Sequence, residues 1–301
     1  MIRSLLRFVK HTLAGMASIR HLGLIKAQSE YLLRETARLA AAERRSAWLA
    51  RRHSTQGAQT KASFDFQWDQ MPTGKALPSD PAFMAGLEAQ LIEMIRVPRE
   101  WFAGKRIADI GCGMGRYSYG MLELGAHVTS CDQSEAALRR TAELCREFAD
   151  RSTLERVDLL EWDETAAFDL AFSFGVVHHT GNTYLAIDHV CRKVKPGGRL
   201  FLMVYGVPET RPAFLEVNDY ERIAGEIRGL SFEERKVFLE QRFGPDGAHG
   251  WFDATSPRIN DRLTFEEIYD LLTELGFTRI ERVVVARNHH IVATNGVYVR
   301  E

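Results

Sequence analysis

The fold is decided by residues 107–115, which read Ile-Ala-Asp-Ile-Gly-Cys-Gly-Met-Gly. The apolar start predicts a buried strand that ends at Asp109–Ile110, and the three glycines predict a tight turn that opens a helix. Glycines let the backbone approach a ligand closely, and the first turn of a helix offers unpaired N–H donors. We therefore expect a ligand-binding loop here rather than a plain strand-to-helix connection.

Outward from this loop, strand-like and helix-like patterns alternate along the chain. Strands are expected at about 106–110, 127–131, 153–157, 169–174 and 199–204. Helices are expected at about 115–124, 134–148 and 182–193. Such alternation predicts an α/β fold with a doubly wound, mostly parallel sheet and helices on both faces. The glycine loop then lies at the point where the strand order reverses, which is where such sheets bind ligands.

The C-terminal third departs from this alternation. Residues 206–262 contain two helical patterns and a loop with Gly and Pro. A helix at 264–275 begins with a capping box and stops at Gly276, which is typical of a helix end. Two β-rich stretches, about 278–286 and 291–299, predict a terminal hairpin.

Acidic residues follow the second and third predicted strands. Asp132 ends the second strand beside the glycine loop, where a carboxylate can accept hydrogen bonds from both hydroxyls of a ribose. Asp158 follows the third strand, where an acid can accept from an adenine amine while Leu159 packs on the base. Either acid alone is also compatible with a helix cap or a solvated strand end.

These residues resemble the class I S-adenosylmethionine (SAM) dependent methyltransferase superfamily. The resemblance rests on DIGCGMG at 109–115, on Asp132, on FDLAFS at 168–173 and on VKPGGRLF at 194–201. It covers residues 105–205 strongly, and the last helix and hairpin more loosely. It implies a seven-stranded, mostly parallel sheet of the methyltransferase type. It also implies S-adenosyl-L-methionine as cofactor and S-adenosyl-L-homocysteine as product.

The resemblance further implies a role for each motif residue. The loop glycines face the methionine part of SAM, and Asp109 helps to organise that end. Asp132 binds the ribose and Asp158 binds the adenine, while the backbone at Ser173–Phe174 meets the methionine ammonium. The expected cofactor-binding residues are Asp109, Gly111, Gly113, Gly115, Asp132, Gln133, Asp158, Leu159, Phe174 and Trp68.

Two other classes of protein remain as alternatives. A NAD-dependent oxidoreductase on a Rossmann fold shares the architecture, but its fingerprint is GxGxxG, whereas this chain has GxGxG followed by Arg116. A non-catalytic SAM-binding partner protein would keep the fold without the reaction. A purely structural domain does not need the three glycines and both acids together, which argues against that alternative.

Candidate catalytic residues follow the fourth predicted strand, in Phe-Gly-Val-Val-His-His-Thr at 174–180. His178 or His179 can take a proton from a hydroxyl acceptor, because the pKa of imidazole lies near neutrality. Alternatively, one of them caps the next helix or packs structurally. Tyr205, at the tip of the fifth strand, is a comparable candidate. Many methyl transfers need only in-line positioning, because SAM is already activated.

Three parts are expected along the chain. These are a basic helical arm at 1–62, an aromatic and proline-rich lid with a linker helix at 63–104, and a SAM-binding domain at 105–301. The insert at 206–262 is expected to cap the acceptor site. It mixes polar and aromatic residues, as in His-Gly-Trp-Phe-Asp at 249–253. This mixture suits a sugar or an oxygenated ring, and equally an ordinary loop-rich cap.

The lid prediction rests on Phe-Asp-Phe-Gln-Trp at 64–68. A polar connector is expected before it at 54–62, and a helix after it at about 81–96. In one interpretation this segment folds over the cofactor, with Trp68 or Gln67 touching SAM. In the other it is a hydrophobic anchor that packs the arm onto the domain.

Charge is unevenly distributed. Residues 1–60 hold 11 Lys or Arg and 3 Asp or Glu, against 28 and 37 in the remainder of the chain, whose totals are 39 and 40. The basic arm has three interpretations: a helix on an anionic membrane surface, a helix packed on protein, or a cleavable targeting segment. Helices usually bury apolar stripes against protein, which favours a subunit or body contact through residues 1–30.

Composition limits the partners and the location. The body is acidic and has no basic stripe, which argues against nucleic acid. Four cysteines without a CxxC pair predict neither disulfides nor a metal site, and favour a reducing compartment. We therefore expect a cytoplasmic enzyme, with peripheral membrane contact left open. The resemblance implies that it transfers the SAM methyl group by an SN2 reaction, and we expect the acceptor to be an oxygen of a small molecule, sugar or lipid-linked intermediate.

Overall fold

A computed structural model describes residue 28 and residues 54–71, 81–207, 219–285 and 288–296. All but residue 28 belong to one compact unit, Trp48–Glu301. Its helices are α2 (Thr55–Gln70), α3 (Pro81–Ile95), α4 (Arg116–Glu123), α5 (Glu135–Leu144), α6 (Thr183–Lys193), α7 (Asp219–Glu226), α8 (Phe232–Thr255) and α9 (Phe265–Glu274). Its strands are β1 (Arg106–Ile110), β2 (His127–Asp132), β3 (Ser152–Arg156), β4 (Phe168–Phe174), β5 (Val194–Tyr205), β6 (Phe277–Val285) and β7 (Asn288–Asn295). Short 3₁₀ turns are η1 (Arg99–Phe102), η2 (Arg146–Phe148), η3 (Leu159–Glu161) and η4 (Val177–His179).

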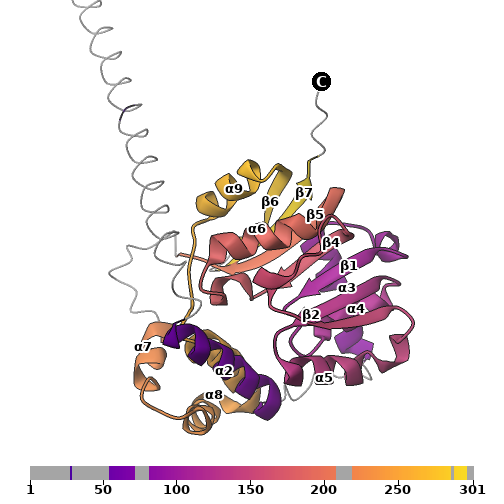
Figure 1. Cartoon of the computed structure of the whole chain (residues 1–301). Helices are drawn as coiled ribbons and strands as arrows, with labels where there is room; N and C mark the ends of the chain where they lie inside the picture. The colour runs from indigo at the N-terminus through magenta and orange to yellow at the C-terminus, as the bar shows by residue number, and fades with distance from the viewer. Residues whose placement is uncertain (1–27, 29–53, 72–80, 208–218, 286–287, 297–301) are drawn as a thin grey trace, which may run out of the picture. The chain divides into compact units, whose positions relative to one another are not determined.

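The seven strands form one sheet in the order β3-β2-β1-β4-β5-β7-β6 (Figure 1). The strands β1 to β5 pair in parallel, whereas β7 runs antiparallel to both β5 and β6. The order reverses between β1 and β4, so the carboxyl ends of these two strands flank the crevice where such sheets bind ligands. This confirms the predicted α/β fold with a seven-stranded, mostly parallel sheet and a terminal hairpin.

The core lies between the sheet and the helices that cover it. Helices α4 and α5 pack on β2, α6 packs on β4 and β5, and α3 contacts β5 and β7. At the centre, the rings of Phe172 and Phe201 stack with centroids 4.7 Å apart, and both side chains are fully buried. Truncating a buried phenylalanine of this kind costs about 3–5 kcal/mol of unfolding free energy. The packing of this pair therefore stabilises β4 and β5, whose carboxyl ends carry the site.

The segment before the sheet differs from the prediction. Ser54 caps the helix α2, which runs without interruption through 54–62, so the expected polar connector is wrong and the boundary at 62/63 falls inside a helix. Thr60 and Ser63 are buried although they are polar. They bond to residues 256–259, so a polar helix face is satisfied by the insert rather than by water.

The insert consists of α7 and α8, and α2 lies alongside α8 (Figure 1). A kink divides α8 at Gly244, which has a φ of 73° and is followed by Pro245. The helical segments on both sides of this kink contribute to a second apolar cluster, which includes Leu239 and Phe252. The predicted capping box of α9 is confirmed, since the Thr264 side chain and Glu267 bond reciprocally to the backbone.

The arm predicted at 1–62 falls outside the described residues, except for residue 28 and residues 54–62. Its contact with a membrane or a subunit through residues 1–30 is therefore left as a proposal. Within the segments that the structure describes, no helix is both long and apolar enough to cross a membrane.

Candidate active site

The glycine loop links the end of β1 to α4. Gly111, Gly113 and Gly115 all have positive φ, at 73°, 55° and 82°, which side chains rarely adopt. A Cβ at Gly111 would lie 2.3 Å from a methyl group of Val176, so that approach excludes any side chain. The Thr141 hydroxyl donates to the carbonyl of Gly113 at 3.0 Å, which fixes the loop from α5.

Asp109, which opens the loop, is buried behind it. Its Oδ2 accepts from the Ser118 hydroxyl at 2.5 Å, and that hydroxyl lies 2.7 Å from Ser130 Oγ. Burial raises the pKa of Asp109 to about 7, although the Ser118 bond opposes this rise. A carboxylate that is poorly compensated in this way attracts a cation, such as the ammonium group expected of the ligand.

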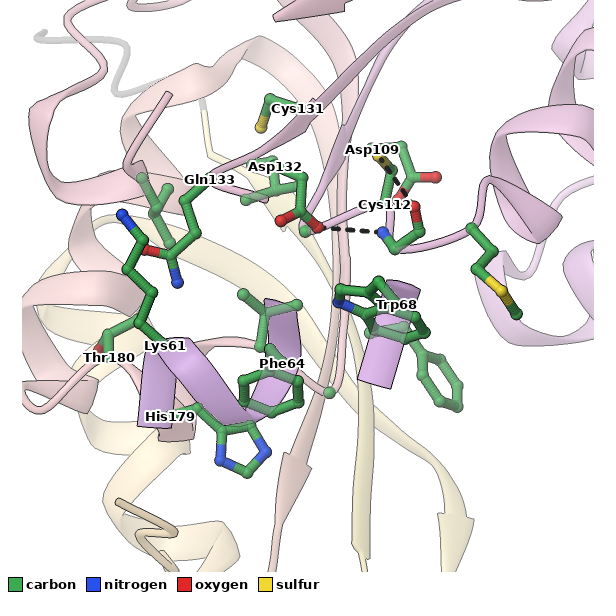
Figure 2. Close-up of a pocket in the computed structure, with 18 of the residues that line it drawn as sticks. Lys61, Phe64, Trp68, Asp109, Cys112, Cys131, Asp132, Gln133, His179 and Thr180 are labelled. Carbon is green, nitrogen blue, oxygen red and sulfur yellow. Dashed lines mark hydrogen bonds between the residues drawn. The ribbon is translucent and has the colours of Figure 1, made fainter. Parts of the chain in front are cut away.

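Asp132 lies at the tip of β2 and faces the loop (Figure 2). Its Oδ2 accepts from the backbone N–H of Gly113 at 3.1 Å, and its Oδ1 accepts from that of Ser134 at 2.9 Å. Burial raises the pKa of Asp132 to about 6 in spite of these bonds. The neighbouring Gln133 lines the same cavity.

The remaining predicted cofactor residues gather around this point. Asp158 caps the turn η3, with its Oδ1 accepting from the Leu160 N–H at 2.9 Å. Asp158, the buried Leu159 and Phe174 all line the cavity. The expected residues of the sheet are therefore brought together at the carboxyl ends of β1, β2, β3 and β4, except for Gly115, which caps α4 and is not among the described residues that line the cavity.

The helix α2 closes the opposite side of this cavity. Phe64 and Trp68 project from it toward the loop and Asp132 (Figure 2). The ring of Trp68 is so close to Gly113 that a Cβ there would lie 3.0 Å from it. Gln67, the other proposed contact, is fully buried and donates instead to His249 Nε2 at 3.1 Å. Of the two, only Trp68 lines the cavity among the described residues.

The three predicted catalytic residues occupy different places. His179 lines the cavity, beside the ring of Phe64 at 4.9 Å. His178 is fully buried and stacks on Tyr205 with centroids 4.0 Å apart. Within the described part of the chain, neither His178 nor Tyr205 lines the cavity. The Tyr205 hydroxyl reaches its edge, however, by donating to Asp253 Oδ2 at 2.8 Å.

The hydrogen bonds of His179 determine its tautomer. Nδ1 lies 2.8 Å from the carbonyl of Ile259, which can only accept, so Nδ1 carries the proton. Nε2 is then an unprotonated acceptor, and it is buried without a hydrogen-bond partner among the described residues. Burial lowers the pKa of His179, against the pull of Asp253 and the bond to Ile259. The imidazole is therefore neutral at physiological pH and free to accept a proton.

The cavity has a volume of about 1260 Å³. This exceeds the range of about 300–1,000 Å³ that is usual for a single ligand, and leaves room for two. His249 and Asp253 of α8 line it next to Trp68 and His179. The sequence indicated an acceptor cap here but not which residues face inward, because that depends on how α8 packs on α2. In the segments described, no cluster of three or more His, Cys, Asp or Glu side chains could hold a metal ion.

Comparison with known proteins agrees with this geometry. Residues 108–200 match the protein family described as "Methyltransferase domain". The chain is 40% identical over 104 residues to a ubiquinone biosynthesis O-methyltransferase of Maricaulis maris, covering 32% of this chain and 39% of that protein. It is 30% identical over 187 residues to the protein of the same name from Cereibacter sphaeroides, covering 60% of this chain and 63% of that one. The chain thus spans less than two thirds of the length of these relatives.

Among solved structures, magnesium protoporphyrin IX methyltransferase from Synechocystis, with bound S-adenosylhomocysteine, superimposes with a TM-score of 0.50 and 17% identity. The superposition covers 80% of this chain and 97% of that one, and at this identity it bears on the fold alone. The matched domain, the sheet order with its antiparallel β7 and the glycine loop all agree. Residues 108–200 thus match a methyltransferase domain, within a sheet whose strand order and antiparallel β7 are those of the class I SAM-dependent methyltransferase fold.

Proposed function

We propose that this chain transfers a methyl group from SAM to a hydroxyl oxygen of a small-molecule acceptor. One observation carries the proposal: a single cavity is lined both by the glycine loop with Asp132 and by His179, whose buried Nε2 has no hydrogen-bond partner among the described residues. The first feature fits a nucleoside with a cationic methionine end. The second fits removal of a proton from the acceptor. The names of the O-methyltransferase relatives further support oxygen as the atom methylated.

The residues present fit the cofactor. The cradle formed by Gly111 and Gly113 leaves no space for a Cβ, and Asp109 lacks a cationic partner among its bonded neighbours. Asp132 would accept from the ribose hydroxyls, and Asp158 with Leu159 would hold the adenine. SAM bound there supplies an electrophilic methyl group on a sulfonium centre.

His179 acts as the general base in this proposal. Its Nδ1–H is held by the Ile259 carbonyl, which leaves the lone pair of Nε2 to accept the proton of the acceptor hydroxyl. As the acceptor oxygen attacks the methyl group, its proton passes to Nε2. The protonated imidazole is then stabilised by the negative charge of Asp253, which acts on it more strongly than that of Asp261. A positioned base of this kind contributes about 10²–10⁴-fold to the rate.

The acceptor would lie against the insert. Tyr205 donates to one oxygen of Asp253, which orients that carboxylate at the edge of the cavity. Phe64, Trp68 and His249 supply flat apolar surface beside it. This combination favours an oxygenated ring over an open aliphatic chain, while sugar and lipid-linked acceptors remain alternatives within the proposal.

The proposal is tested by incubating the full-length protein with labelled SAM and pools of hydroxylated aromatic compounds, sugars and lipids. We expect S-adenosylhomocysteine to form only when a pool contains a hydroxyl acceptor. If SAM binds but no pool is methylated, the non-catalytic partner protein becomes the better description.

Residues 1–30 support a separate proposal, since they are basic and apolar at once. We infer that they bind either an anionic membrane surface or another copy of the chain, in the cytoplasm. Co-sedimentation with anionic vesicles at low salt separates the two. Failure to sediment excludes the membrane contact, and an unchanged oligomer after removal of these residues excludes the subunit contact.

A further inference from the structure

A second recess lies in the insert, between α7, α8 and the segment 254–262, with a volume of about 190 Å³. Arginine is its most frequent lining residue. The four arginines are Arg228, Arg235, Arg258 and Arg262. Among the described residues that line it, Glu221 is the only carboxylate, and it is exposed. Arginines therefore outnumber carboxylates among the described residues that line the recess.

Arg235 is the buried member of this set, with 5% of its surface exposed. Its guanidinium donates to the carbonyls of Leu230, Ser256 and Arg228 at 3.0, 3.0 and 3.2 Å, and to the Ser256 hydroxyl at 3.0 Å. All of these partners are neutral. Buried charges are normally paired with an opposite charge, so this cation is solvated by oxygen atoms but is not neutralised by the residues described.

A second guanidinium converges on the same point. Arg258 donates from Nη2 to the Arg228 carbonyl at 3.0 Å, so two cations share one carbonyl oxygen. The proximity of Arg258 lowers the pKa of Arg235 further, in addition to burial. Elsewhere in the insert the arrangement is different, because Arg222 and Arg242 both pair with Glu226, at 2.7 and 2.9 Å.

We propose that this recess binds an oxyanion of the phosphate type, carried by a ligand other than SAM. A tetrahedral oxyanion would neutralise the converging cations. The exposed guanidinium groups of Arg228 and Arg258 would supply the N–H donors, since Arg235 already makes four hydrogen bonds to protein oxygens. The volume suits one such group with a few waters, given about 30 Å³ for a water, but not a whole nucleotide.

Hydrogen bonds connect a segment beside the recess to residues that line the active-site cavity. The backbone N–H of Arg258 donates to Gln59 Oε1 at 2.9 Å, and that of Ile259 donates to Thr60 Oγ1 at 2.9 Å. The Ile259 carbonyl in turn holds His179. An oxyanion that fixes Arg258 therefore steadies the segment that positions both α2 and the proposed base.

The test uses the full-length protein saturated with S-adenosylhomocysteine, so that the glycine loop is occupied. Inorganic phosphate is titrated calorimetrically at ionic strength matched with chloride. Two exposed arginines are replaced together, R228S/R258S, because a variant at buried Arg235 can fail to fold. The matched control is R242S, an exposed arginine of the same insert that pairs with Glu226.

We expect phosphate to bind the wild type and the control equally, and the double variant at least about tenfold more weakly, since each removed guanidinium loses a charge-assisted bond. Vesicles of phosphatidylcholine with and without phosphatidic acid identify the source. If the double variant binds vesicles more weakly than the wild type only when they contain phosphatidic acid, the site belongs to a lipid headgroup. If it binds only free phosphate more weakly, the site belongs to a soluble ligand. Equal behaviour of wild type and double variant in both experiments overturns the proposal, and SAM binding would be unaffected by that outcome.

Discussion

The two walls of the active-site cavity are built in different ways. The sheet wall consists of Gly111, Gly113, Asp132 and Asp158, all at the carboxyl ends of neighbouring parallel strands. The helix wall consists of residues from α2 and α8, whose contact between Gln67 and His249 joins positions 182 apart in the chain. Strand register places the first set, whereas tertiary packing of two helices places the second.

This difference separates the wall that would bind the cofactor from the wall that would bind the acceptor. The sheet wall presents backbone N–H groups and carboxylates, which fit a cofactor common to the whole superfamily. The helix wall presents Phe64, Trp68, His249 and Asp253, whose combination belongs to this chain's own insert and N-terminal helix. His179 stands between them, since it follows β4 but is held by Ile259 after α8. Acceptor choice should therefore follow the helix wall.

Replacing His179, which lies between the two walls, should give the largest effect on the turnover rate. We expect His179→Gln to lower the turnover rate by about 10²–10⁴-fold with SAM affinity unchanged, because only proton removal is lost. The wild-type rate should rise with pH through a pKa below the usual 6.5 and level off by neutrality, since burial lowers the pKa of His179. Titratable groups around it are Asp253, Asp261, His178 and Tyr205.

The control for this prediction is His178→Gln, because His178 is buried against Tyr205 and does not line the cavity. Equal loss of turnover in both variants at equal unfolding temperature would contradict the assignment of the base. Retention of normal turnover by His179→Gln would transfer the role to Asp253 or Tyr205.

At Asp109, beside the sheet wall, the requirements of protein stability and of SAM binding should oppose each other. The pKa of Asp109 is raised from 3.8 to about 7, so the stability that this group contributes is present below its unfolded pKa and is lost as pH rises through about 7. Asp109→Asn should therefore raise the free energy of unfolding near pH 8 by about 2–4 kcal/mol, from the conversion of pKa units to free energy. Near pH 3 the gain should vanish.

The same variant should bind SAM more weakly, because a cationic ligand loses its carboxylate. Chemical denaturation at both pH values and a binding titration test the two effects. A variant that is less stable than the wild type at every pH would show that Asp109 is needed for folding rather than for binding.

The helix wall should depend on one buried hydroxyl. Thr60 Oγ1 accepts from the backbone N–H groups of Arg258 and Ile259 at 3.1 and 2.9 Å. Thr60→Val removes the acceptor of the buried Ile259 N–H, whereas the Arg258 N–H keeps Gln59 Oε1 at 2.9 Å, and the loss costs about 1–3 kcal/mol of unfolding free energy. Cofactor affinity and turnover should fall together, because α2 and His179 both depend on this segment.

The matched control is Asp69→Asn, also in α2. Asp69 pairs with Arg139 at 2.9 Å, but both side chains are about half exposed, so the change should cost less than about 1 kcal/mol. If the two variants destabilise the protein equally, the buried polar contacts do not hold the helix wall in place.

The comparison of walls also explains what could be predicted from the sequence. The glycine loop, Asp132 and the capping box of α9 depend on residues close together in the chain or at the ends of adjacent strands, and the structure confirms that they lie where expected. The helix α2 could not be predicted in full, because its N-terminal half is polar and carries no apolar periodicity. Its polar residues are satisfied by the insert instead, through contacts such as that of Ser63 with Ser256.

For a similar reason, the sequence could not decide which of the two adjacent histidines faces the cavity. The residues are adjacent and chemically identical, and only the turn η4 sends His179 to the cavity and His178 beneath Tyr205. Asp253 as a partner of Tyr205 likewise depends on the kinked helix α8. Their roles in the reaction stay predictions until an acceptor is known.

The most direct test of the account is calorimetric titration of SAM into the wild type and Asp132→Ala, with NADH as the competing ligand class. Asp150→Ala, at an exposed acid outside the cavity, serves as the control. We expect micromolar SAM binding by the wild type and the control, about 10–100-fold weaker binding by Asp132→Ala, and no heat from NADH. Binding of NADH without SAM, or SAM affinity that is unchanged in Asp132→Ala, would contradict the assignment of the sheet wall as the cofactor site.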